Sequence, residues 1–248
     1  MRVSVGDAQL FVAVIGSGVA VRGGRLVDRP SVILIHGGPG YDHTNLRTFH
    51  APLSRTAQMI FYDQRGHGRT EAPAGRYSFA TLLADALAVM DALGVAKAHF
   101  CGLSMGGATA MGLAQQAPAR LDRVIVCDTP CASTPASAQQ WEERIVVAQK
   151  QGMAPLVEPT VSRWFPPETV AANPPHLANI RRMIAATPVN GFVGCAAALG
   201  DHDYRSAVAS VTRPVLFIAG EKDGTTPAAM RQMQGELAGS RYVEMPGA

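Results

Sequence analysis

Short apolar runs and amphipathic stretches alternate along the first half of the chain. The runs are rich in β-branched residues and bounded by Gly, Pro or Asp, a pattern typical of strands buried on both faces of a parallel sheet. They cover residues 31–36, 58–62, 98–101 and 123–127. Helices are expected over 78–93 and from Ser104 to about Gln116. This alternation predicts a doubly wound, mostly parallel sheet, with antiparallel strands added at its start near 10–15 and 19–22.

The pattern changes in the second half of the chain. Residues 130–205 contain helical segments separated by prolines and no apolar strand. The later elements expected are strands at 214–219 and near 241–245 and a helix over 226–237. We therefore expect a sheet domain built from residues 1–129 and 206–248, with residues 130–205 inserted as a helical cap.

Composition narrows the class of protein. The 248 residues are 47% hydrophobic and 17% charged, which suits a packed core and excludes a disordered chain. The net charge is only +3 and the basic residues form no stripe, so a nucleic-acid partner is not expected. The first residues have no apolar core of the kind that a secretory leader needs, and no apolar run approaches the ~18 residues of a membrane span, so neither feature is expected. The four cysteines form no CxxC pair, so we expect free thiols in a cytoplasmic protein.

The strongest chemical motif is Gly102-Leu-Ser-Met-Gly106, directly after an apolar run and directly before a helix. A serine in this place sits on a sharp strand-to-helix turn that exposes its hydroxyl, and the flanking glycines avoid clashes in the turn. The helix N-terminus adds backbone N–H groups and a positive dipole. The context predicts Ser104 as a catalytic nucleophile.

A second glycine-rich motif, His36-Gly-Gly-Pro-Gly40, ends the first long strand. Backbone N–H groups in such a turn can bind the oxyanion that forms when a serine attacks a carbonyl. We expect the N–H groups of Gly38 and Met105 to form this oxyanion hole, with Gly37 as the alternative donor.

A serine nucleophile needs a histidine base oriented by a carboxylate. Asp223, after the strand at 214–219, is the expected acid, and Asp128 is the alternative. The histidine is expected in the loop after the last strand, where the sequence ends at Ala248. None of the seven histidines occupies that place, and only His202 stays open as a residue facing the site.

These residues together resemble the α/β-hydrolase superfamily over essentially the whole chain. From about Tyr77 onward the chain looks like 3-oxoadipate enol-lactonases. The stretches that carry this resemblance are 98–107, 163–165 and 195–204. In that family a histidine typically follows a Gly or Ala after the final strand, one or two positions beyond the equivalent of Ala248. We therefore expect the natural protein to be longer than this chain, and the chain as given to be inactive or impaired.

The front of the chain, through residues 36–40 and 63–68, looks more like proline iminopeptidases. Those enzymes usually carry a tryptophan where this chain has Met105. They also have a larger cap whose acidic residues bind the amino terminus of the substrate, whereas residues 130–205 hold few acids. The lactonase or esterase resemblance is therefore favoured over an aminopeptidase.

The sequence thus predicts an α/β-hydrolase fold and a serine hydrolase that cleaves a small-molecule ester or lactone through an acyl-enzyme on Ser104. In the cap, Trp141 and Trp164 are candidate wall residues, and Arg144 or Arg163 is a candidate partner for a substrate carboxylate. No metal or organic cofactor is expected, because no His/Cys/carboxylate cluster has ligand spacing. An aminopeptidase and a non-catalytic ligand-binding protein that lacks the histidine remain the alternatives.

Overall fold

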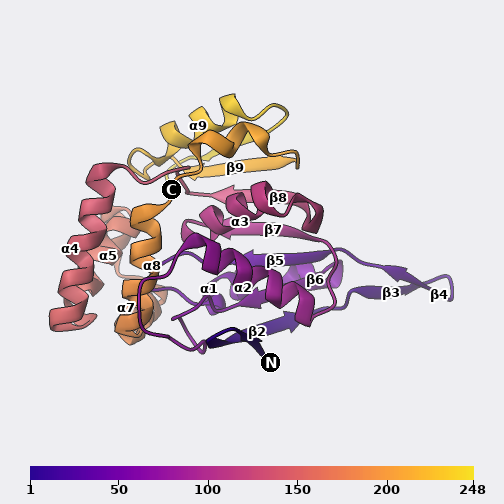
Figure 1. Cartoon of the computed structure of the whole chain (residues 1–248), viewed down its shortest axis with the longest axis horizontal. Coiled ribbons are helices and arrows are strands. Elements are labelled where there is room, and N and C mark those ends of the chain that lie inside the picture. Colours follow the sequence, from indigo (N-terminus) through magenta and orange to yellow (C-terminus); the bar gives the residue numbers. More distant parts are fainter.

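A computed structural model describes the backbone of residues 1–248 and every side chain except that of Ala207. Its centre is an eight-stranded sheet in the order β1-β2-β6-β5-β7-β8-β9-β10 (Figure 1). The strands β1 and β2 are antiparallel to each other, β2 is antiparallel to β6, and the remaining pairs are parallel. The strands are β1 (Arg2–Val5), β2 (Ala8–Ile15), β5 (Ser31–Ile35), β6 (Gln58–Tyr62), β7 (Ala98–Leu103), β8 (Leu121–Cys127), β9 (Val215–Gly220) and β10 (Arg241–Met245).

The expected doubly wound, mostly parallel sheet is confirmed, and so is the antiparallel strand near residues 10–15, within β2. The expectation that residues 19–22 join the same sheet is wrong. They form β3 (Val19–Arg22), which pairs only with β4 (Arg25–Asp28) in a separate two-stranded ribbon. The ribbon is largely exposed, with Val21 70% and Leu26 75% accessible, so no buried face ties it to the sheet.

Both faces of the central strands are covered, as their uninterrupted apolar sequences require. On β5, Ile33 and Ile35 belong to the main core, which includes residues of α2 and α3, whereas Leu34 belongs to a second cluster with Phe61 and Leu46 of α1. Because successive side chains of a strand point to opposite faces, α1 lies on one face of the sheet and α2 and α3 lie on the other. These helices and the last one are α1 (His43–His50), α2 (Phe79–Ala92), α3 (Met105–Gln116) and α9 (Thr226–Glu236).

Five helices lie between β8 and β9 in sequence: α4 (Pro135–Gln151), α5 (Val157–Trp164), α6 (Pro167–Ala172), α7 (Pro175–Ala186) and α8 (Val189–Asp201). They gather beyond the carboxyl ends of the parallel strands, with α4 packed on α8 and α5 packed on α7 (Figure 1). In open α/β sheets, ligands bind at this edge. These helices therefore cover the carboxyl edge of the sheet, where the predicted site residues lie.

Within the described residues, no single helix combines the length and hydrophobicity needed to cross a membrane. Only α7 and α8 pass that test together, and they are bent by 95° at their junction. Their apolar residues have a place inside the fold, because Leu177, Ile184 and Phe192 are buried in the core.

Candidate active site

Ser104 sits at the bend between β7 and α3, with a backbone φ of 51° and ψ of −115°. A non-glycine residue at positive φ is strained and persists only where its surroundings hold it. Here the N–H of Ser104 donates to the carbonyl of Cys127 at 2.8 Å, and the Thr129 hydroxyl donates to the carbonyl of Ser104 at 2.8 Å. Both partners lie at the carboxyl end of β8 or just beyond it, so the neighbouring strand fixes the bend. The side chain of Ser104 is half-buried.

The glycines around Ser104 are required by close backbone approach. A β-carbon at Gly102 would lie 2.1 Å from the carbonyl oxygen of Gly106, and one at Gly106 would lie 2.2 Å from that of Ile35. Both distances are far inside van der Waals contact, and both meet backbone that cannot swing away. The structure therefore has the tight strand-to-helix turn that the motif predicts.

The glycine-rich loop after β5 runs directly beside this bend. A β-carbon at Gly37 would lie 3.3 Å from Cβ of Ser104 and 3.1 Å from the carbonyl oxygen of Leu103. Gly38 has a φ of 139°, a backbone conformation that side chains rarely adopt. The buried Met105 begins α3, so its N–H lies at the helix N-terminus beside Ser104. Gly37 and Ser104 are thus neighbours, and the predicted role of Gly38 and Met105 as an oxyanion hole stays a prediction.

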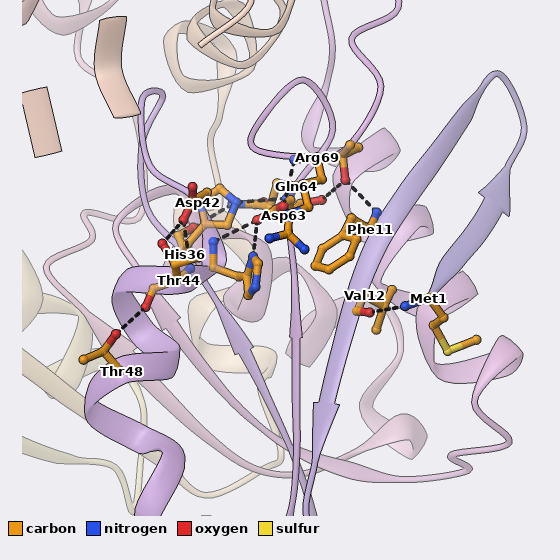
Figure 2. Close-up of polar contacts among 12 residues, drawn as sticks. Met1, Phe11, Val12, His36, Asp42, Thr44, Thr48, Asp63, Gln64 and Arg69 are labelled. Carbon is orange, nitrogen blue, oxygen red and sulfur yellow. Dashed lines mark hydrogen bonds and ion pairs between the residues drawn. The ribbon is translucent and has the colours of Figure 1, made fainter. Parts of the chain in front are cut away.

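His36 anchors the base of this loop in the core. Its Nε2 accepts the N–H of Gln64 at 2.9 Å, so Nδ1 carries the proton and donates to the carbonyl of Gly37 at 2.6 Å. The Gln64 side chain donates in turn to the carbonyl of His36 at 2.6 Å (Figure 2). Burial lowers the pKa of His36, which keeps the ring neutral and the hydrogen-bond pattern fixed.

The two candidate acids lie in turns at the carboxyl ends of adjacent strands. The carboxylate of Asp128, after β8, accepts the N–H of Gly220 at 2.7 Å. Burial raises the pKa of Asp128, and the negative charge of Asp223 adds to that shift. Asp223 is half-buried in the turn after β9, where its N–H donates to the carbonyl of Gly220 at 3.1 Å. The two carboxylates are therefore close enough to interact electrostatically.

No histidine is hydrogen-bonded to Ser104 or to either candidate acid within the described part of the chain. His67 lies close to the loop, but burial lowers its pKa to about 3, which makes it a weak base. His202 donates from Nδ1 to the carbonyl of Leu199 at 2.9 Å and lines a cavity of about 210 Å³ whose lining contains neither Ser104 nor Asp223. The structure does not bring His202 to the nucleophile.

The four candidate cap residues divide into two groups. Trp141 is buried, and the guanidinium carbons of Arg144 and Arg163 lie 4.8 and 5.1 Å from its ring centre. Neither arginine forms an ion pair with a described carboxylate. Crowding by protein atoms lowers the pKa of Arg163 to about 10, the charge of Arg144 adds to this, and Asp223 opposes it. Trp164 lies apart from this group and stacks on Tyr41 instead.

A polar network beside the site was not visible in the sequence. The buried carboxylate of Asp63 accepts from the backbone N–H and Nδ1 of His43, at 2.8 and 2.7 Å, and from the N–H of Arg69 at 2.9 Å. Burial alone would raise the pKa of Asp63, but the hydrogen bonds from the side chain of His43 and from the backbone N–H groups of Arg69 and His43 lower it overall. His43 and Asp63 thus form a buried hydrogen-bonded pair.

Ligand-type atoms of Asp42, His43 and Asp63 lie within 4.8 Å of one another, a spacing that suits a metal ion (Figure 2). Their existing contacts oppose that use. Asp63 already accepts three N–H groups, and Asp42 accepts the N–H of Thr44 at 2.8 Å as the N-cap of α1. A cation would have to replace these hydrogen bonds. We therefore interpret the cluster of Asp42, His43 and Asp63 as a structural support for the loop that precedes α1.

Comparison with known proteins agrees with this geometry. A family model described as the alpha/beta hydrolase fold matches residues 30–248. 3-Oxoadipate enol-lactonase 2 of Acinetobacter baylyi is 36% identical over 171 residues, which is 69% of this chain and only 63% of that protein. 3-Oxoadipate enol-lactonase 1 of the same organism is 32% identical over 78% of this chain and 72% of its own length.

Solved structures give the same result. The enol-lactonase from Burkholderia xenovorans LB400 is 33% identical, with a TM-score of 0.90 over 99% of this chain and 91% of that one. A hydrolase from Pseudomonas aeruginosa PA01 is 31% identical, with a TM-score of 0.91 over 99% and 89%. The resemblance to enol-lactonases read from residues 98–107, 163–165 and 195–204 is confirmed. The chain belongs to the α/β-hydrolase fold family.

Proposed function

We propose that this protein is a serine hydrolase that cleaves a small-molecule ester or lactone through an acyl-enzyme on Ser104. The observation that carries the proposal is the approach of the Gly37–Gly38 loop to a serine held at positive φ between sheet and helix. This arrangement presents a hydroxyl and backbone N–H groups to the same small volume. The similarity of the chain to enol-lactonases supports a lactone or ester as the substrate over other acyl compounds.

In the proposed reaction, Oγ of Ser104 attacks the carbonyl carbon while its proton passes to a base. The carbonyl oxygen becomes an oxyanion, which accepts hydrogen bonds from the N–H groups of Gly38 and Met105. Each such donor typically contributes about 3 kcal/mol to transition-state stabilisation. The ester or lactone C–O bond then breaks, the leaving oxygen takes a proton from the base, and water releases the acyl group in the reverse sequence.

Asp223 is the proposed acid of the triad, and the proposal needs an imidazole between it and Ser104. The backbone at Ala248 lies beside the turn that holds Asp223. Its carbonyl accepts the N–H of Lys222 at 2.6 Å, and a β-carbon at Gly220 would lie 3.0 Å from its carbonyl carbon. A histidine that follows Ala248 would therefore start next to the Asp223 turn. That histidine stays a prediction.

The cap supplies the proposed specificity. Arg144 and Arg163 lie over the ring of Trp141 without a carboxylate partner among the described residues, and Arg163 feels the charge of Asp223 from the core. Two crowded cations without a carboxylate partner among the described residues favour a substrate that carries a carboxylate of its own. Trp141 and Trp164 would then bound the apolar part of the substrate.

Covalent labelling tests the nucleophile. Intact-mass analysis after treatment with a fluorophosphonate should find one adduct, mapped by peptide digestion to Ser104, and Ser104→Ala should abolish it. Free imidazole should accelerate labelling of the 248-residue chain, because it can accept the proton that Ser104 loses. An adduct elsewhere would refute the site. Absence of any adduct, even with imidazole and in a chain that continues past Ala248, would favour the non-catalytic binding protein.

Activity on a proline amide distinguishes the aminopeptidase. Turnover of a prolyl amide that exceeds turnover of matched esters and lactones would replace the proposed substrate class and leave the nucleophile unchanged.

A further inference from the structure

The oxyanion loop continues from the core directly into the cap. Gly37 lies beside Ser104, and four residues later the ring of Tyr41 stacks on the ring of Trp164 in α5. The two ring centres are 4.6 Å apart and the planes differ by 21°, the geometry of a stacked pair. Trp164 lies 60 residues further along the chain than Ser104, so tertiary packing alone brings it to this loop.

Gly40 forms a second contact between the same loop and the cap. A β-carbon at Gly40 would lie 3.4 Å from Cη2 of Trp164 and 3.2 Å from Cγ1 of Ile184 in α7. The φ of Gly40 is 120°, which other residues rarely adopt. The loop backbone therefore passes under two cap helices at van der Waals distance, with no room for a side chain at this point.

The core holds the other side of the loop. Gly37 packs on Ser104, and a β-carbon at Gly38 would lie 3.5 Å from Nε2 of the buried His67. The position of the Gly38 N–H relative to Ser104 thus depends on the core beneath the loop and on the cap above it. Of these two sets of contacts, only the contacts with the cap join elements that could separate while the sheet stays folded.

We propose that Trp164 is a positioning residue for the oxyanion hole, which it holds in place by stacking on Tyr41 and packing on Gly40. This inference rests on the proposed function and deepens it, since it assigns to Trp164 a role beyond bounding the substrate. The ring face of Trp164 that covers Tyr41 is not available to a ligand. The stack makes catalysis depend on how the cap is seated on the loop.

The Tyr41 hydroxyl has no part in this role. Burial raises the pKa of Tyr41 to about 12, so the phenol stays neutral at physiological pH. Its hydroxyl forms no hydrogen bond with any described residue. Tyr41→Phe therefore keeps the stacking ring and serves as the conservative variant, whereas Tyr41→Ala removes the ring.

The test uses 4-nitrophenyl acetate, whose acyl group is too small to depend on the cap wall. Serine hydrolases that lack a triad member retain acceleration from the oxyanion hole and binding, so the readout does not require the histidine. Trp164→Ala and Tyr41→Ala should each lower kcat by about two- to tenfold, the range for loss of one aromatic pair, with KM little changed. The double variant should lose no more than either single one. Tyr41→Phe, which keeps the stacking ring, should stay close to the parent.

Phe165→Ala is the matched control for loss of a cap aromatic. Phe165 follows Trp164 but packs on His176, with ring centres 6.2 Å apart, so its loss should leave kcat unchanged. Circular dichroism and thermal unfolding check that each variant folds. Additive losses in the double variant, or an unchanged kcat in Trp164→Ala with an altered KM only for bulky esters, would overturn the positioning role. A fluorophosphonate adduct that maps away from Ser104 would instead overturn the proposed function itself.

Discussion

The carboxylate of Asp128 accepts the backbone N–H of Gly220 at 2.7 Å and so joins the ends of β8 and β9 beneath the Asp223 turn. Burial raises the pKa of this carboxyl above its ordinary value of 3.8, with a smaller contribution from the charge of Asp223. The folded protein therefore binds this proton more tightly than the unfolded chain does. The contribution of Asp128 to stability is full below pH 3.8 and is lost as the pH rises through the folded-state pKa.

We therefore expect Asp128→Asn to be more stable than the parent at about pH 7, because the neutral amide keeps an acceptor for Gly220 without the buried charge. The gain should shrink toward zero at about pH 3. Urea unfolding at both pH values measures it. A variant that is less stable at neutral pH than at acid pH, relative to the parent, would contradict the shift.

Substitutions of Asp223 and Asp128 test which of the two carboxylates orients the predicted histidine. In a form of the protein that carries the predicted histidine, Asp223→Asn should lower kcat by about 10⁴-fold, the effect of losing the correct tautomer. Asp128→Asn should cost tenfold or less, since its carboxylate is already engaged by Gly220. Steady-state hydrolysis of one ester by both variants gives the ranking, and the reverse order would assign the acid to Asp128.

The strain at Ser104 is measurable as stability. Its φ of 51° is easier for glycine than for any side chain, and left-handed backbone costs other residues about 1–2 kcal/mol. Ser104→Gly should therefore be more stable than Ser104→Ala by about 1 kcal/mol, although both lack the hydroxyl. Chemical unfolding of the two variants measures the difference. Equal stability would show that the surrounding hydrogen bonds, and not the φ angle, dominate this bend.

Crowding around the bend makes a second stability prediction. The β-carbon of Gly106→Ala would meet the carbonyl oxygen of Ile35 at 2.2 Å, so this variant should lose at least about 2 kcal/mol. Gly235→Ala is the matched control. That glycine is exposed near the end of α9, and a β-carbon added there would have no neighbour within 4 Å. The control variant should gain about 0.5–1 kcal/mol from helix propensity. Similar unfolding midpoints for both variants would contradict the close approach.

The cap arginines should discriminate between charged and neutral substrates. Arg163→Gln should raise KM about tenfold for an ester that carries a carboxylate, since a hydrogen bond to a charged group is worth about 1.5–3 kcal/mol. A neutral ester of the same size should be unaffected. Arg144→Gln should behave in the same direction. An equal change for both esters would mean that the arginines only support Trp141.

The strands of the sheet could be predicted well from the sequence, because a strand buried on both faces leaves a continuous run of apolar residues. The apolar runs at 31–36 and 58–62 become β5 and β6, whose residues are almost all inaccessible. The motif around Ser104 also predicted its own geometry, since Gly102 and Gly106 are glycines for a reason that is local to the bend. Residues 19–22 had the right pattern for a strand, but no pattern says which strand will pair with it.

The contacts that define the site depend instead on packing between distant segments. Nothing in the sequence pairs Tyr41 with Trp164 or Arg163 with Trp141. The first pair forms only where α5 packs on the loop after β5, and the second only through the packing of α4 and α5 within the cap. His43 and Asp63 were likewise unremarkable in separate loops, and burial turns them into a hydrogen-bonded pair. Local patterns predicted which residues carry chemistry, and the tertiary fold determines what holds them.

The β3–β4 ribbon leaves the sheet at the end opposite the cap helices (Figure 1). Its turn is Gly23-Gly24, with φ angles of 55° and 75°, and a β-carbon added at either glycine would have no neighbour within 4 Å. Exposed hairpin tips of this kind tolerate insertion well. An affinity tag or a fluorophore could therefore be grafted between these glycines, where it would report on the whole enzyme without touching the catalytic end.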